Sequence, residues 1–109
     1  MIKYVSLVKR KSGLTPEEFV QYWKEKHGPL VVKVVPEIRK YVQNHLVRTP
    51  GVDYDIDGIV EIWWDDLAAY QRVQAWMKSD EAKALHEDEE KFLDTSNPRR
   101  YIVEEHVIK

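Results

Sequence analysis

The sequence predicts an α+β fold in which four antiparallel strands form one sheet and helices cover one of its faces. Two observations predict it. Hydrophobic residues recur at strand and helix spacings in the order β-α-β-β-α-β, which is the ferredoxin-like split βαβ arrangement. The 109 residues are also enough for one hydrophobic core but not for two. We therefore expect a single domain over residues 1–109.

The first strand and the start of the first helix have clear local signals. Residues 2–9 alternate in hydrophobicity and are rich in β-formers, which predicts a strand. Thr15 is a good N-cap, Pro16 suits the first helical position, and Glu18 completes a capping-box pattern. We expect a helix to begin there.

This helix carries a histidine within its apolar stripe. Three- and four-residue steps predict one buried face, made of Phe19, Trp23, His27, Leu30, Val31 and Val34. We expect the helix to run to about His27, because Gly28 and Pro29 should break it. Pro29 should then begin a further turn through Val34, which Pro36 ends.

The second half of the chain is expected to contribute three strands and two helical segments. Residues 38–49 and 58–65 predict an antiparallel hairpin with a long loop, and residues 101–108 predict the last strand. One helix face is formed by Leu67, Tyr70, Val73, Gln74 and Met77. Ser79 is the expected N-cap of a further helix, whose face is formed by Ala82, Leu85 and Phe92.

Composition argues against several classes of function. Seventeen basic and 19 acidic residues give a net charge of −2, which indicates neither nucleic acid nor a membrane surface as a partner. The chain has no cysteine, no apolar run long enough to span a membrane and no signal-peptide pattern. We expect a cytoplasmic protein. No paired metal ligands, G-x-S-x-G, Walker loop or G-x-G-x-x-G motif occurs.

Alternation along the strands divides their side chains into two sets. In the second strand, Val42 and Leu46 are expected beneath the helices, which leaves Tyr41, Gln43, His45 and Val47 on the open face. We expect Tyr4, Glu61 and Trp63 on that open face too. Such a mixed surface is typical of a small-molecule cavity wall or of an interface with another subunit. The surface can serve as cavity wall and as interface at once if the sheets of two subunits meet and enclose a space.

Several segments resemble the EthD-like family of dimeric α/β-barrel proteins. They are "MIKYVSLVKRKSGLTPEEFVQYWKEKHGPLV", "YVQNH", "DGIVEIWWDD" and "EEHVI". The most specific element is W-x-x-x-H-x-P-L, followed by Y-x-x-x-H; these are Trp23, His27, Pro29 and Leu30, then Tyr41 and His45. The resemblance implies a ferredoxin-like homodimer whose sheets pack together around a small-molecule pocket, usually without a cofactor. Relatives include polyketide dehydratases and decarboxylases, lactone isomerases and an ether-degradation protein.

Roles for individual residues follow from this resemblance. His27 matches the helix histidine that isomerase-type relatives use for proton transfer, and Tyr41 matches the strand tyrosine that assists it. Those relatives have another histidine in the loop between the second and third strands, whereas "PGVDYDIDG" has none. His45 is the candidate for that second imidazole.

We therefore expect a cofactor-independent lyase or isomerase that moves a proton next to a carbonyl of a phenolic, polyketide or lactone. His27 is the expected general acid/base, with Tyr41 and His45 stabilising the oxyanion. The expected substrate-binding residues are Tyr4, Gln43, Glu61 and Trp63. From spacing alone, His27 is equally well explained as a core histidine that binds a freed carbonyl.

Two other classes of function remain open from the sequence. One is a monooxygenase, either cofactor-free or haem-dependent, and the other is an accessory protein that binds a small molecule without chemistry. His86 is interpreted as part of a solvated helix face and His106 as a structural residue.

Overall fold

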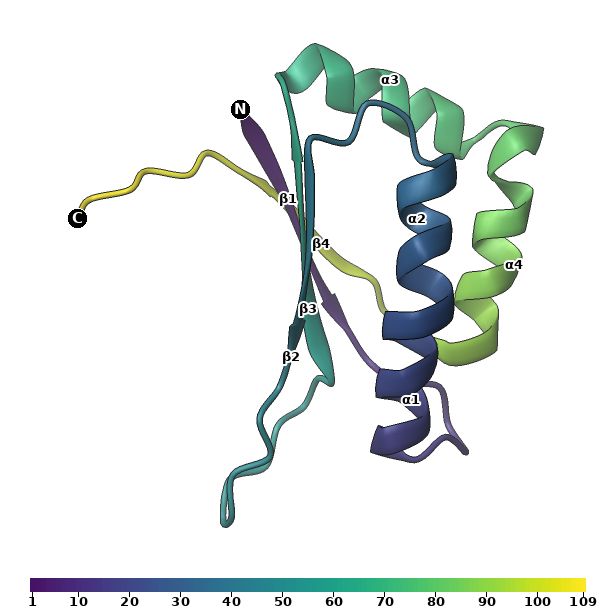
Figure 1. The fold of residues 1–109 in the computed structure, drawn as a ribbon, viewed down its shortest axis with the longest axis vertical. Helices are drawn as coiled ribbons and strands as arrows, with labels where there is room; N and C mark the ends of the chain where they lie inside the picture. Colours follow the sequence, from purple (N-terminus) through teal and green to yellow (C-terminus); the bar gives the residue numbers. More distant parts are fainter.

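The computed structural model describes residues 1–109 and places one four-stranded sheet against a layer of helices (Figure 1). The elements are β1 (Ile2–Val8), α1 (Pro16–Tyr22), the π-helix η1 (Trp23–His27), α2 (Gly28–Val34), β2 (Lys40–His45), β3 (Gly58–Trp64), α3 (Leu67–Met77), the 3₁₀ turn η2 (Asp80–Ala82), α4 (Lys83–Phe92) and β4 (Arg99–Val103). The predicted α+β, ferredoxin-like arrangement is confirmed. No helix is long and apolar enough to cross a membrane.

All strand pairs in the sheet are antiparallel, in the order β2-β3-β1-β4. Figure 1 shows the sheet nearly edge-on, with α1 to α4 on one side and an open face on the other. The register aligns Tyr4 with Ile62 and Ile62 with Tyr41, so these three side chains share one face. That face packs on the helices, because all three contact the hydrophobic core.

The prediction of which side chains face the helices was therefore wrong for two strands. Tyr4, Tyr41, Gln43 and His45 lie on the helix-covered face, together with Val60, Ile62 and Trp64. Val42 pairs with Glu61 and shares the open face with it. Both sets of strand side chains contain apolar residues, so alternation separated them correctly but did not identify the covered one.

The second and last strands are shorter than the sequence suggests. His45 pairs with Gly58, the first residue of β3, so residues 46–49 have no partner strand. Val103 pairs with Lys3 at the beginning of β1, and residues 104–109 extend past the sheet edge without strand structure. In both places the partner strand ends before the β-forming sequence does.

The first helix continues through the expected break at Gly28 and Pro29. The capping box is confirmed, because the Thr15 hydroxyl accepts from the Glu18 N–H and the Glu18 carboxylate accepts from the Thr15 N–H. Gly28 is helical, at φ −55° and ψ −52°, and its N–H donates to the Trp23 carbonyl five residues earlier. Pro29 then lies in the first turn of α2, where the absent N–H costs little. The π turn thus carries the chain past the proline without a break.

One face of this helical segment is buried at strict four-residue intervals, at Phe19, Trp23, His27, Val31 and Val35. Trp23 packs directly against the first residue of β3. A Cβ added to Gly58 would lie 2.5 Å from Trp23 Cζ3, so only glycine permits this approach. The histidine is therefore part of the main interface between the helix and the rest of the fold.

The two later helices begin in different ways. The Asp66 carboxylate accepts from the Ala69 N–H and caps α3. Ser79 stands at the N-cap position of η2 as predicted, but its hydroxyl donates to the Trp76 carbonyl and forms no capping bond.

A buried carboxylate joins the loop after β1 to the loop between β2 and β3. Asp57 is only 6% exposed and accepts from the Arg10 N–H at 2.9 Å, the Arg10 guanidinium at 2.9 Å and the Arg48 guanidinium at 2.8 Å. Burial alone would raise the pKa of Asp57, but these donors outweigh it and hold the pKa below its usual value.

Because the pKa of Asp57 is lower in the folded state, its ionised form stabilises the fold above the unfolded-state pKa, near 3.9. This contribution is lost as the pH falls through the lower folded-state value. We expect Asp57→Asn to reduce the free energy of unfolding by about 1.5–3 kcal/mol at pH 7 and by less at pH 3. Urea titrations at both pH values measure this. Asp53→Asn, in the same loop and exposed, is the control and should change little. A constant deficit at both pH values would contradict the assignment.

Candidate active site

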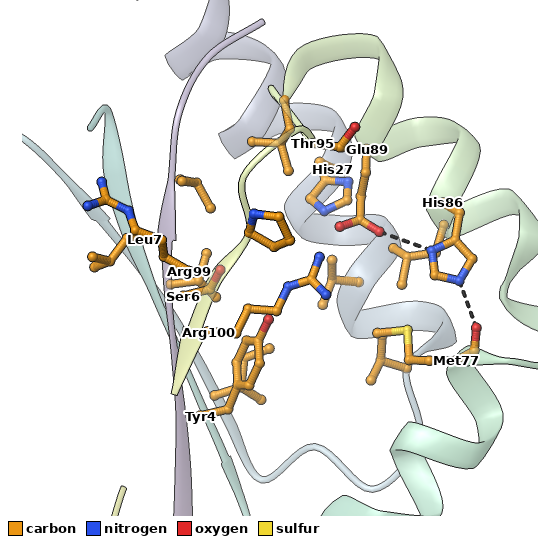
Figure 2. A pocket seen from close by; sticks show the side chains of 18 of the residues that line it. Tyr4, Ser6, Leu7, His27, Met77, His86, Glu89, Thr95, Arg99 and Arg100 are labelled. Carbon is orange, nitrogen blue, oxygen red and sulfur yellow. Dashed lines mark hydrogen bonds and ion pairs between the residues drawn. The ribbon is translucent and has the colours of Figure 1, made fainter. Parts of the chain in front are cut away.

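A cavity of about 680 Å³ lies between the sheet and the helices (Figure 2). Its walls include β1, η1, α3, α4 and the segment leading into β4. The volume is within the range of small-molecule sites. This cavity lies within one chain and on the helix-covered side of the sheet, whereas the sequence predicts a cavity on the open face.

His27 lies in the wall of this cavity, at the end of the π-helix. It is 6% exposed, and its ring centroid is 4.7 Å from that of Phe92. Its Nδ1 is 2.8 Å from Oδ2 of Asp88, a buried carboxylate of α4. A carboxylate accepts hydrogen bonds, so the proton of the neutral imidazole is on Nδ1 and Nε2 is the basic nitrogen.

The Asp88 carboxylate forms a second hydrogen bond, to a tyrosine of α1. The Tyr22 hydroxyl donates to its other oxygen, Oδ1. Burial, and then the bond to Asp88, raise the pKa of Tyr22 to about 12, so its phenol remains a neutral donor. Both carboxylate oxygens are occupied, which fixes the orientation of the His27 ring.

The second nitrogen of His27 is available to a ligand. Nε2 has no hydrogen-bond partner. Every fully buried polar side-chain atom in the structure has such a partner, so Nε2 is not fully buried. Figure 2 shows the His27 ring at the cavity wall. The alternative in which His27 binds a freed carbonyl does not hold, because the polar partner of its ring is Asp88.

Two tyrosines from the sheet also line the cavity. Burial raises the pKa of both Tyr4 and Tyr41, so each hydroxyl stays protonated at neutral pH. Tyr4 packs against Trp64 and Tyr70, with ring centroids 6.1 and 6.2 Å away. Neutral phenols in a partly apolar cavity suit the binding of a carbonyl or enolate oxygen.

Gln43 and His45 form a polar chain behind Tyr41. The Gln43 amide donates to the Tyr41 hydroxyl at 3.0 Å and to the Trp23 carbonyl at 2.9 Å, and its oxygen is 2.9 Å from His45 Nε2. The His45 ring stacks on Trp23, with centroids 4.5 Å apart. Burial, and then the charge of Lys24, lower the pKa of His45. Neither Gln43 nor His45 lines the cavity, so the structure does not bring them together with His27.

Glu61 and Trp63 lie on the open face, as predicted, and therefore outside this cavity. Glu61 forms an ion pair with Lys3 at 2.5 Å and accepts from Asn44 at 2.9 Å. The Trp63 ring lies beneath the ammonium groups of Lys3 and Lys40, at 5.0 and 4.9 Å from its centroid. The side chains of β3 alternate, and Val60, Ile62 and Trp64 are the ones that face the helices.

Polar and charged side chains from α4 and β4 also line the cavity. His86 is half-exposed, as predicted, but it also belongs to the lining; its Nε2 is 2.7 Å from the Met77 carbonyl and its Nδ1 is 3.4 Å from Glu89. Figure 2 shows Arg100 reaching into the same space from β4. Nowhere do three or more His, Asp or Glu side chains gather in a way that could hold a metal ion.

Asp88 is a candidate site residue that the sequence did not reveal. It lies two residues after His86, in the segment that the sequence predicts to be a solvated helix face. Its spacing was informative, however, because it lies three residues after Leu85 and four before Phe92, on the buried face. A carboxylate within an apolar stripe requires a buried partner, and His27 is that partner.

Residues 11–96, which include His27 and Asp88, match the model of the EthD domain. The chain belongs to the EthD family. No curated protein sequence matches it.

Solved structures with this EthD fold come from several organisms. An ethyl tert-butyl ether D (EthD) family protein from Bacillus halodurans is 24% identical, with a TM-score of 0.72, over 97% of this chain and 99% of that one. A protein from Arabidopsis thaliana is 15% identical, with a TM-score of 0.71, over 100% and 99% of the two chains. A dimeric protein of unknown function from Bacteroides fragilis, with a ferredoxin-like fold, is 15% identical, with a TM-score of 0.63, over 94% of each chain. At these identities the similarity establishes a shared fold.

Proposed function

We propose that this EthD protein is a cofactor-independent enzyme that moves a proton next to a carbonyl of a small oxygenated organic molecule. Elimination, isomerisation and ring closure all begin with this step. The observation that carries the proposal is the His27–Asp88 dyad, because it presents a basic nitrogen to a cavity large enough for a substrate.

The surrounding residues suit each part of this chemistry. Nε2 of His27 takes the proton from carbon, and Asp88 stabilises the imidazolium that results. Tyr4 and Tyr41 are neutral hydroxyl donors for the enolate oxygen. The aromatic and aliphatic lining binds the apolar part of the substrate and limits the access of water.

A two-stage experiment tests the proposal. A thermal-shift screen against enolisable ketones, lactones, phenolics and haem first finds compounds that bind. Nuclear magnetic resonance in D₂O then measures deuterium incorporation next to the carbonyl of each compound that binds. We expect exchange that depends on the protein and is lost in His27 variants.

Other outcomes would count against the proposal. Binding without exchange would favour an accessory protein. Stabilisation by haem alone, with a Soret band, would favour the oxygenase alternative.

We also propose that two copies pack through the open face of the sheet. Val5, Val42 and Ile59 place apolar surface on this face, where no helix covers it, and the similar Bacteroides fragilis protein is dimeric. Light scattering during gel filtration should give the mass of a dimer, and Val42→Asp should shift it toward a monomer. The control is Val32→Asp, at an exposed position of α2, which should leave the mass unchanged. A monomeric mass for the unmodified chain would contradict this interface.

A further inference from the structure

One arginine differs from all the others in having no carboxylate partner. The chain has six arginines. Five form an ion pair with an aspartate or glutamate: Arg10, Arg39, Arg48, Arg72 and Arg99. Arg100 forms none, although the chain is rich in acidic residues.

The unpaired guanidinium lies at the cavity. Arg100 pairs with Ser6 in the sheet register, so its side chain is on the helix-covered face, with Tyr4 and Ser6. Figure 2 shows it extending from β4 toward α4, into the space bordered by Tyr4, His27 and Glu89. Glu89, the acidic residue of α4 in this wall, pairs with His86 at 3.4 Å.

We propose that the substrate of this enzyme is an organic carboxylate, and that Arg100 binds its two carboxylate oxygens. The inference rests on the proposed function, because it identifies the class of molecule on which His27 acts. A guanidinium presents paired N–H groups in one plane, which fit both oxygens of a carboxylate. Arg100 is an exposed residue of the cavity lining, so its guanidinium is accessible to an anionic ligand that enters from solvent.

This arrangement gives the two ends of the substrate different tasks. The carboxylate on Arg100 orients the molecule and selects it over neutral analogues. The enolisable carbon is then directed to His27, on the other side of the same space. The tyrosine hydroxyls then stabilise the negative charge that develops on the enolate oxygen.

The experiment compares matched acids and esters. The probes are levulinate and phenylpyruvate, each with its methyl ester, and the dissociation constants are measured by calorimetry. We expect each carboxylate to bind more tightly than its ester by about tenfold to a hundredfold, the range of a charge-assisted hydrogen bond. Arg100→Gln should remove this preference and leave ester binding unchanged, and Arg100→Lys should restore only part of it.

Arg99→Gln is the matched control. Arg99 is the neighbouring residue of the same edge strand and also borders the cavity, but its side chain extends to the other side of the sheet from Arg100 and pairs with Asp55 (Figure 2). This variant should retain the preference for carboxylates. Equal binding of acids and esters, an Arg100→Gln variant that keeps the preference, or a panel in which nothing binds would each overturn the inference.

Deuterium exchange separates this inference from the proposed function. Exchange that depends on His27 but shows no preference for acids would leave the function standing and remove the role of Arg100. Acid binding that depends on Arg100, without exchange in any probe, would support the anion site and contradict the catalytic proposal.

Discussion

Replacement of His27 by alanine is expected to lower kcat for proton exchange by a factor of about 10² to 10⁴, the usual contribution of a general base. Nε2 of His27 is the basic nitrogen that the dyad presents to the cavity. Binding of the same compound should weaken much less, because the tyrosines and the apolar lining remain. The measurement is deuterium incorporation at saturating concentrations of the tightest-binding ketone.

Because His27 is buried against Phe92, alanine leaves a void, and a second variant is needed. His27→Gln fills most of the space but has no basic nitrogen, so it should fold normally and remain slow. His106→Ala, in the exposed C-terminal segment, is the histidine control. Exchange by folded His27→Gln at the original rate would remove His27 from the mechanism.

Asp88→Asn is expected to lower the exchange rate by about 10²-fold or more while leaving the backbone fold unchanged. The aspartate accepts from Nδ1 of His27, whereas an asparagine can turn its amide donor toward that nitrogen. The proton of the neutral ring would then move to Nε2, which could no longer act as a base. The variant should therefore be slow although the His27 ring itself is unchanged.

The tautomer itself provides a readout that a purely structural role would not change. ¹⁵N chemical shifts of the His27 ring should show a protonated Nδ1 in the original protein and a protonated Nε2 in Asp88→Asn. Glu87→Gln, one residue earlier on the exposed side of α4, is the control and should change neither the rate nor the shifts. A slow Asp88→Asn variant with the original tautomer would assign Asp88 to packing alone.

The order of elements was readable from the sequence because each carries its own local signal. The capping box at Thr15 and the β-rich runs need no tertiary information. The ends of β2 and β4 were not readable, because a strand ends where its partner ends and not where its own sequence ceases to favour β structure.

The site was only partly predictable for a related reason. Alternation correctly grouped Tyr41 with Gln43 and His45, but the aliphatic Val42 was assigned to the core by hydrophobicity. That rule fails where the helix-covered face encloses a cavity that tolerates polar groups. The Asp88 partner of His27 lies 61 residues away in the chain, so only tertiary structure pairs them.

The π turn has a consequence for the phase of the whole helical segment. An α-helix turns about 100° per residue, so a side chain four positions later lies about 40° further round. Over Phe19, Trp23, His27, Val31 and Val35 this rotation would carry the later residues off the buried side, yet all five are buried. The wider turn at Trp23–His27 takes more residues per revolution and rotates the series back. The four-residue repeat thus results from a wide turn, and the same turn keeps His27 on the buried side of the helix.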